Sequence, residues 1–327
     1  MAQDLRRLRQ DLAELGAAGL QVAPLDDPWP DERTGSGAVT VGVHRLGDRP
    51  TEGLGRFDIL ITTDATAPRP WVRTANPSET LARLADAVER QPVAAAVAAQ
   101  VLRMTLDLRF EDALALESIA YSMLLASEGY RAWRGATPVR QRPETPAPRV
   151  ALEVSDAAIG IRLTRPARRN AFDAAMRDEL AEALGFALLH PEAPPVTLAG
   201  DGPAFSAGGD LDEFGQAPDA GWAHMIRVAR SPARLVHALG ERITARLHGA
   251  CVGAGIEAPA AAARVVATPD AFFRLPEVSM GLIPGAGGTA TIPRRIGRHR
   301  TCFMAISGAD IDARTALAWG LVDEIAP

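Results

Sequence analysis

Two glycine-rich turns have the composition to hold a reacting group. The first spans residues 204–211 (AFSAGGDL) and the second spans residues 248–257 (HGACVGAGIE), and each follows a short apolar run that predicts a buried strand. Small residues let backbone N–H groups approach a ligand closely, and a helix after the turn favours negative charge there. Two such turns could donate two N–H groups to one oxygen atom, as in an oxyanion hole. For either turn alone, tight packing of a strand against a helix would be a sufficient explanation.

Two glutamates in apolar surroundings are the candidates for proton transfer. Glu257 ends the second turn inside the run GAGIEAPAAAA, and Glu277 lies in the run FFRLPEVSMGL just before a glycine-rich loop. Burial raises the pKa of a carboxyl group toward neutrality, where the group can accept or donate a proton. Either residue considered alone could equally be a buried carboxylate that only accepts backbone hydrogen bonds.

Other kinds of site lack their sequence signals. Neither turn matches the glycine pattern of a dinucleotide fold or of a phosphate loop, and the sequence has no Gly-x-Ser-x-Gly elbow of a serine hydrolase. The histidines show no His-x-x-x-His spacing, so we expect no metal site. His248 begins the second turn and is expected to be a structural hydrogen-bonding residue.

The composition is that of a globular protein. The 327 residues are 47% hydrophobic and 23% charged, and the net charge of −5 gives no footprint for binding nucleic acid. No run approaches the roughly 18 apolar residues of a membrane span, and residues 1–20 lack the apolar segment of a signal peptide. Cys251 and Cys302 lie in separate apolar runs and are expected to be buried and unpaired. We therefore expect a cytoplasmic protein that binds neither nucleic acid nor membrane.

The first part of the chain predicts helices and a few strands. Leucines at spacings of three and four predict an amphipathic helix over residues 3–19, and residues 24–37 are rich in turn-forming residues. Asn76 and Pro77 have the types expected at the start of a helix. Strands are expected over residues 38–44 and 57–63, and further helices over residues 92–106 and 110–134.

A proline-rich segment divides the chain. Residues 137–149 (TPVRQRPETPAPR) hold four prolines in thirteen positions, which predicts a linker. After it, apolar strands alternate with amphipathic helices, one of which begins at Asp173. This alternation predicts an α/β core, in which ligand sites lie at strand ends and helix N-termini.

Five segments after the linker form a recognisable set. They are RPARRNAF (165–172), AFSAGGDL (204–211), HGACVGAGIE (248–257), FRLPEVSMGLIPGAGGT (273–289) and GADIDARTALAWGLVDEIAP (308–327). In their order and spacing they resemble the crotonase (enoyl-CoA hydratase/isomerase) superfamily, and the similarity runs from about Val150 to Pro327. The resemblance implies an α/β, crotonase-like fold, whose core is a spiral of ββα repeats.

The resemblance implies roles for the residues at matching positions. Gly209 and Ala254 match the positions whose amides form the oxyanion hole of the family, with Ala254 in place of a common glycine. Glu257 and Glu277 match its two catalytic glutamates, and the loop Gly285 to Gly288 matches one that lines the acyl pocket. The residues that match coenzyme A contacts are Arg168, near the phosphates, and Ala207, Gly208 and Asp210.

The implied activity is hydration of a 2-enoyl-CoA thioester, because both glutamates are present. Coenzyme A would enter as part of the acyl-CoA substrate, with no permanently bound cofactor, and the family implies a homo-oligomer (a trimer or hexamer). The alternatives are isomerisation of a double bond or hydrolysis of the thioester at the same site. A non-catalytic acyl-CoA-binding protein is a third interpretation.

The order of the segments departs from the family. Its members continue past the GLVDEI segment into several helices, whereas here such helices precede the linker. We therefore expect a circular permutation, and the alternative is an unrelated helical domain fused to the core. The basic run over residues 294–300 is expected to be a solvated helix face. The expected parts are a cap (1–75), a helical region resembling the C-terminal helices of the family (76–136), a linker (137–149) and the crotonase core (150–327).

Overall fold

The structure is a computed structural model that describes residues 7, 10–11, 19–25, 37–45, 47–140 and 147–326. Almost all of the helix predicted over residues 3–19 and most of the loop predicted over residues 24–37 lie outside the described residues. The middle of the predicted linker lies outside them as well.

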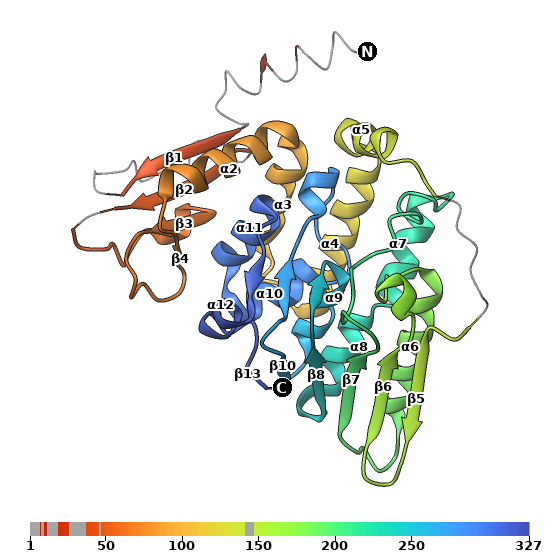
Figure 1. Cartoon of the computed structure of the whole chain (residues 1–327). Helices are drawn as coiled ribbons and strands as arrows, with labels where there is room; N and C mark the ends of the chain where they lie inside the picture. Colours follow the sequence, from red (N-terminus) through yellow and green to blue (C-terminus); the bar gives the residue numbers. More distant parts are fainter. Residues whose placement is uncertain are drawn as a thin grey trace.

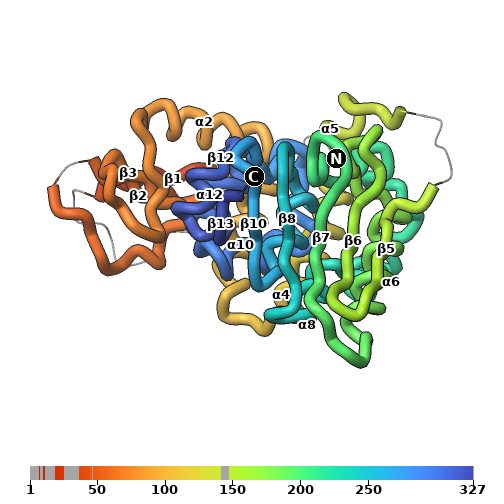
Figure 2. The backbone as a smooth tube through the Cα atoms, turned by 60° about the horizontal axis from the view of Figure 1, so that its bottom comes forward, coloured from red at the N-terminus to blue at the C-terminus, as the bar shows by residue number. Residues whose placement is uncertain are grey.

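A six-stranded sheet forms the centre of the second part of the chain (Figure 2). Its order is β13-β10-β8-β7-β6-β5, and all neighbouring strands are parallel except β5 and β6. Alternate residues of β6 are buried, which is the pattern of a strand with one face on the core. The strands predicted after the linker are confirmed. They are β5 Val150–Val154, β6 Ile159–Leu163, β7 Val196–Gly200, β8 Ile243–Leu247 and β10 Arg264–Ala267. The short strand β13 (Glu324–Ile325), which was not predicted, completes the sheet.

Helices and a second, three-stranded sheet complete this part. The helix α6 (Ala174–Leu189) begins as predicted at Asp173, whose carboxylate accepts a hydrogen bond from the Met176 amide at 2.7 Å. The small sheet has the order β12-β11-β9. The remaining elements are β9 Ala250–Val252, β11 Phe272–Arg274, β12 Ile311–Asp312, α7 Ala220–Ala229, α8 Pro232–Leu239, α9 Ala254–Glu257, α10 Gly288–Ile296, α11 Arg298–Ser307 and α12 Ala313–Trp319.

A separate four-stranded sheet lies in the described residues before the helix α2 (Pro77–Arg90). All of its strands are parallel and follow the order β1-β2-β3-β4. The strands β2 (Val39–His44) and β3 (Ile59–Thr62) confirm two predictions, and every residue of both is buried. The strands β1 (Leu20–Pro24) and β4 (Val72–Arg73) were not predicted, because they are short and carry a weak hydrophobic pattern.

Four helices connect this sheet to the second part. The helix α2 (Pro77–Arg90) begins as predicted, with the Asn76 side chain accepting a hydrogen bond from the Glu79 amide at 3.2 Å. The prediction of one helix over residues 110–134 was wrong, because one helix ends at Leu125 and a second begins at Glu128. Ser127 accepts a hydrogen bond from the Tyr130 amide and so starts a new helix. The helices after α2 are α3 Pro92–Met104, α4 Phe110–Leu125 and α5 Glu128–Ala136.

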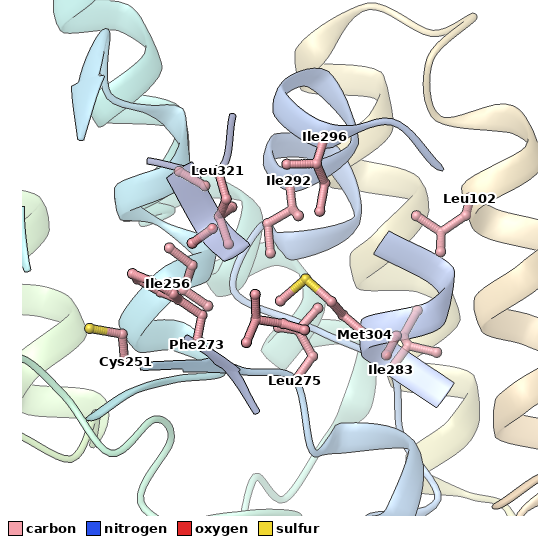
Figure 3. Close-up of a cluster of buried hydrophobic side chains, with 14 of the residues drawn as sticks. Leu102, Cys251, Ile256, Phe273, Leu275, Ile283, Ile292, Ile296, Met304 and Leu321 are labelled. Carbon is pink, nitrogen blue, oxygen red and sulfur yellow. The ribbon is translucent and has the colours of Figure 1, made fainter. Parts of the chain in front are cut away.

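These helices pack directly on the α/β part (Figure 1). The helix α3 lies on α11, and α4 packs against α7 and α10. Leu102 of α3 belongs to the same hydrophobic core as Ile283 and Met304 (Figure 3). The hypothesis of a circular permutation requires such packing, but the hypothesis and the division into four parts stay predictions.

The prediction that the basic run over residues 294–300 is a solvated helix face was wrong. None of its arginines is exposed, and Arg300 is fully buried. Arg294 donates to the carbonyls of Thr105 and Leu108, and Arg300 donates to the carbonyl of Trp71 at 3.0 Å. The run is therefore a set of hydrogen-bond donors that join the helices α10 and α11 to the first part of the chain.

Candidate active site

The two glycine-rich turns lie side by side. The Ser206 amide donates to the carbonyl of Ala250 at 3.1 Å, and the Val252 amide donates back to the carbonyl of Ser206 at 3.0 Å. A Cβ atom on Gly208 would lie only 2.7 Å from the carbonyl oxygen of Val252, and its φ of 90° is in the left-handed region. Glycine is therefore required for the two turns to approach each other.

The two turns lead into different elements. The second turn leads through β9 into α9, a helix of four residues. The expectation of a helix after the first turn was wrong, because no helix begins in the described chain between that turn and Ala220 of α7. The first turn is fixed instead by Phe172, whose amide donates to the carbonyl of Gly208 at 2.8 Å.

Each turn includes an unpaired backbone amide at a residue that lines a cavity. In the part of the chain that the structure describes, no group accepts a hydrogen bond from the amide of Gly209 or from that of Ala254. Both residues line the same cavity. Because buried amides are almost always paired, two unpaired amides in one cavity indicate a place for an acceptor from a ligand.

The pairing of β9 with β11 brings Glu257 and Glu277 together. Phe273 lies opposite Cys251, and the Gly253 amide donates to the carbonyl of Arg274 at 2.9 Å. The segments that continue from these strands therefore stay adjacent. A Cβ atom on Gly253 would collide with Oε1 of Glu277 and would lie 3.6 Å from Oε1 of Glu257. Two carboxyl groups separated by 20 positions thus meet at one glycine.

The two carboxyl groups are both buried, but their hydrogen bonding differs. Glu257 and Glu277 are 2% and 7% exposed. Oε2 of Glu257 accepts hydrogen bonds from the amides of Ala286 and Gly288, at 2.7 and 2.9 Å. Oε2 of Glu277 has no hydrogen-bond partner among the described residues.

These surroundings shift both pKa values upward. Burial raises the pKa of Glu257 to about 7, although the loop amides partly oppose the shift. Burial and then the charge of Glu257 raise the pKa of Glu277 well above its ordinary value. Because two loop amides stabilise the charged form of Glu257, whereas Oε2 of Glu277 has no donor among the described residues, Glu257 is the easier of the two to ionise.

A third buried glutamate comes from α4 and was missed in the sequence analysis. Glu117 accepts hydrogen bonds from the amides of Gly287 and Thr289, both at 2.7 Å. Successive amides of residues 286–289 therefore donate alternately to Glu257 and Glu117, and the two carboxyl groups together fix the loop Gly285 to Gly288. Burial, followed by the charge of Glu257, raises the pKa of Glu117 to about 8. Glu117 stands in the run FEDALALESIAY, where a glutamate among small and apolar residues was the available signal.

A cavity of about 790 Å³ contains these groups. One wall comes from the second part of the chain and carries Gly209, Ala254 and both glutamates, while α4 and α5 supply another wall with Tyr121 and Tyr130. The hydroxyl of Tyr130 is buried and has no hydrogen-bond partner among the described residues. The site is thus built from both parts of the chain.

Three of the residues expected to contact coenzyme A (Ala207, Gly208 and Asp210) belong to the first turn, and the fourth, Arg168, is paired with Asp210. Asp210 forms ion pairs with Arg165 at 2.9 Å and with Arg168 at 3.3 Å. Asp210 lines the cavity, whereas Arg168, Ala207 and Gly208 do not. Gly208 is buried and Ala207 is exposed.

Four further predictions concern His248, the two cysteines, a metal site and a membrane span. His248 makes a hydrogen bond to the carbonyl of Gly202 at 2.9 Å, as expected of a structural residue. Cys251 and Cys302 are buried and unpaired. The described residues contain no cluster of His, Cys, Asp and Glu that could hold a metal ion, and none of their helices is long and apolar enough to cross a membrane.

Comparison with known proteins identifies the family. Residues 153–327 match the family model for enoyl-CoA hydratase/isomerase. The chain is 36% identical over 176 residues to "Probable enoyl-CoA hydratase" of Rhodobacter capsulatus, covering 54% of this chain and 67% of that protein. It is 32% identical over 175 residues to "Mevalonyl-coenzyme A hydratase SIDH" of Beauveria bassiana, covering 51% of this chain and 62% of that protein.

The fold agrees with a solved structure as well. The enoyl-CoA hydratase from Thermoplasma volcanium matches with a TM-score of 0.50 and 31% identity, over 55% of this chain and 72% of that one. The expected crotonase-like α/β fold is therefore confirmed for the part that carries both turns and both glutamates. The chain belongs to the enoyl-CoA hydratase/isomerase (crotonase) family.

Proposed function

We propose that this protein hydrates a 2-enoyl-CoA thioester. The observation that carries the proposal is one cavity with two unpaired amides and two buried carboxyl groups of unequal hydrogen bonding. Two amides suit the oxygen of a thioester that becomes negative during the reaction. One ionised and one protonated carboxyl group suit the two proton transfers that hydration needs.

The reaction would begin at the thioester oxygen. The amides of Gly209 and Ala254 would donate to it, and so stabilise the enolate that forms when a nucleophile adds to C3. Glu257 would act as the base: it would take a proton from water while the water oxygen bonds to C3. The electron pair of the C2–C3 double bond would move toward the thioester oxygen.

Glu277 would complete the addition. Burial and the charge of Glu257 raise its pKa and so favour its protonated form, which can donate a proton to C2 as the enolate returns its electron pair. Glu257 then holds the proton from water and Glu277 is ionised. Transfer of one proton between them through solvent would restore the starting state.

Coenzyme A would enter as part of the substrate. Arg168, Ala207, Gly208 and Asp210 are the residues that we propose lie along it, with Arg168 nearest its phosphates. The pairing of Arg168 with two aspartates, Asp210 and Asp212, would hold its guanidinium in place for that contact. The family also suggests a homo-oligomer, which sedimentation of the purified protein would test.

A turnover assay on crotonyl-CoA tests the proposed reaction. Hydration removes the conjugated double bond, so the absorbance of the enoyl thioester should fall with time. Glu257→Gln and Glu277→Gln should each lower kcat by about 10²- to 10⁴-fold, the usual contribution of a general acid or base.

Two results would count against hydration. Variants as active as the parent would remove the glutamates from the mechanism. Release of free thiol, or a shifted double bond without addition of water, would move the assignment to a hydrolase or an isomerase.

A further inference from the structure

A cationic side chain in the cavity has no role in the proposed hydration. Arg227, on α7, is half-buried and lines the cavity. Its Nε donates to Oγ of Ser118 at 3.0 Å, and its Nη2 donates to Oγ of Ser122 and to the carbonyl of Ser118. Its guanidinium carbon lies 4.9 Å from the centre of the Tyr121 ring. These contacts with α4 fix the guanidinium in one orientation.

Arg227 forms no ion pair with any described residue, although the charge of the buried Glu117 acts on it. The neighbouring arginines of the cavity, Arg177 and Arg230, are paired with Asp178, at 2.7 and 3.1 Å. No carboxylate of a described residue forms an ion pair with Arg227, and none of these residues accepts a hydrogen bond from its Nη1. Burial lowers the pKa of Arg227, which is the physical cost of a cation removed from water. A bound anion would offset that cost.

Tyr121 connects Arg227 to the reacting groups. A Cβ atom on Gly285 would lie 2.7 Å from Cε2 of Tyr121, so the ring packs on the loop Gly285 to Gly288. Amides of this loop donate to Glu257. The guanidinium of Arg227 lies against the same ring. It is therefore one aromatic ring away from the loop. An anionic group at the far end of a short acyl chain fits this separation.

We propose that Arg227 binds a carboxylate at the distal end of the acyl group, so that the preferred substrate is a dicarboxylic enoyl-CoA. This inference rests on the proposed hydration for its reaction, but the recognition depends only on binding. A phosphate of coenzyme A is the other anion that an acyl-CoA offers. We assign the acyl carboxylate because Arg227 lies inside the cavity, whereas Arg168, the cation expected near the phosphates, does not line it.

The test compares acyl groups of equal length with and without the carboxylate. Turnover is measured with glutaconyl-CoA and 2-pentenoyl-CoA, and calorimetric binding with their saturated analogues glutaryl-CoA and pentanoyl-CoA and with free coenzyme A. The parent should favour the dicarboxylic member of each pair by roughly 10- to 100-fold, as expected for a hydrogen-bonded charge pair. Arg227→Met should reduce that ratio to near one, and Arg227→Lys should keep part of it.

Arg230→Met is the matched control, because Arg230 lies on the same side of the cavity and already has a carboxylate partner. It should keep the ratio of the parent. Circular dichroism establishes that each variant is folded, and Arg227→Lys still tests the inference if Arg227→Met is not.

The outcomes separate this inference from the proposed hydration. A parent that hydrates both thioesters equally, and binds both analogues equally, would overturn the role of Arg227 and leave hydration intact. Equal weakening of free coenzyme A and both analogues by Arg227→Met would assign Arg227 to a phosphate and also overturn it. A parent that hydrates neither thioester, yet binds glutaryl-CoA more tightly through Arg227, would overturn hydration and support the anion site.

Discussion

The two parts of the molecule contribute to the cavity in different ways. Besides helix side chains such as Arg227 of α7, residues 147–326 supply backbone amides and carboxyl groups from turns that follow strands. Hydrogen bonds within and between the turns fix the positions of these groups. Residues 77–136 supply side chains from helices, such as Glu117 and Tyr121 of α4. The first kind of group depends on local backbone geometry, and the second depends on how a helix docks. One cavity can therefore be specified partly by motif and partly by packing.

The contact between the two parts is polar as well as apolar. Arg103 of α3 forms hydrogen bonds with both carboxylate oxygens of Asp58, which precedes β3 and lies 3.7 Å from Arg298 of α11. Thr105 donates to the carbonyl of Thr289 at 2.7 Å, next to the loop that holds Glu257. The helices are therefore joined to the reacting groups through the same loop that Glu117 supports.

The largest expected effect is the loss of stability when the buried carboxylate of Asp58 is removed. Asp58→Asn should lower the free energy of unfolding by about 3–5 kcal/mol, because it leaves Arg103 and Arg298 without their buried carboxylate. Urea denaturation at neutral pH measures this change. Asp64→Asn, which removes a more exposed carboxylate near the same sheet, is the control and should cost far less. Equal costs would mean that the buried Asp58 carboxylate does not hold α3 and α11 together beside β3.

The stabilisation that Asp58 provides depends on pH, and the direction of its pKa shift gives the sign of that dependence. Burial alone would raise the pKa of Asp58, but the hydrogen bonds and charge of Arg103 outweigh it and hold the pKa below its ordinary 3.8. A lowered pKa stabilises the folded protein above the ordinary value, and the contribution is lost as the pH falls through the folded value. The difference between parent and Asp58→Asn should therefore shrink in strong acid.

The next effect tests an amide of the second part. Ala254→Pro removes the backbone N–H at the first position of α9, where proline is compatible with a helix. We expect kcat to fall by about 10²- to 10³-fold, as for the loss of one oxyanion donor. Ala254→Gly keeps the N–H and should stay near the parent rate. A folded Ala254→Pro variant with the parent rate would show that this amide does not stabilise the reacting oxygen.

A smaller effect is expected from the side chain that α4 contributes. Glu117→Gln places an NH₂ group against the amide of Gly287 or Thr289, which leaves buried donors unpaired at about 1–3 kcal/mol each. The loop that holds Glu257 should loosen, and kcat should fall roughly tenfold or somewhat more. Glu111→Gln, on the exposed start of the same helix, is the control. If both variants kept the parent kcat, α4 would only cover the cavity.

The smallest effect concerns the pH profile. In the parent, kcat/KM should rise as Glu257 ionises near pH 7, and it should fall at higher pH as Glu277 loses its proton. The charge of Glu117 contributes to the raised pKa of Glu277. Glu117→Gln removes that charge, so the descending limb should move to lower pH by less than about one unit. Movement of the ascending limb alone would contradict this assignment.

Much of the second part could be predicted from its own sequence. The alternation of apolar strands and capped helices predicted the sheet, and Asp173 starts α6 as expected. The glycines of the two turns and the two glutamates in apolar runs predicted a cavity with amides and acids. These features are local, because a glycine at a close approach or a cap at a helix start depends on few neighbours.

The first part was less predictable. A continuous helical pattern concealed the break at Ser127, and the short strands β1 and β4 carry too few residues for a clear period.

One feature of the second part was also predicted wrongly. The basic run of α10 and α11 has the composition of a solvated face, but its arginines bind carbonyl groups of distant segments. A charge pattern does not reveal which carbonyl groups lie within reach.

The sequence by itself determined the residue types of the proposed reaction: two small turns, two isolated acids and their order along the chain. Only the tertiary structure decided that Glu117 shares the loop with Glu257, that Oε2 of Glu277 lacks a partner among the described residues, and that Arg227 lines the cavity without an ion pair to any of them. Turn geometry and capping are set by residues within a few positions of one another. Burial, pairing and pKa depend instead on which segments pack together across more than one hundred residues, as in the hydrogen bond between Glu117 and Thr289.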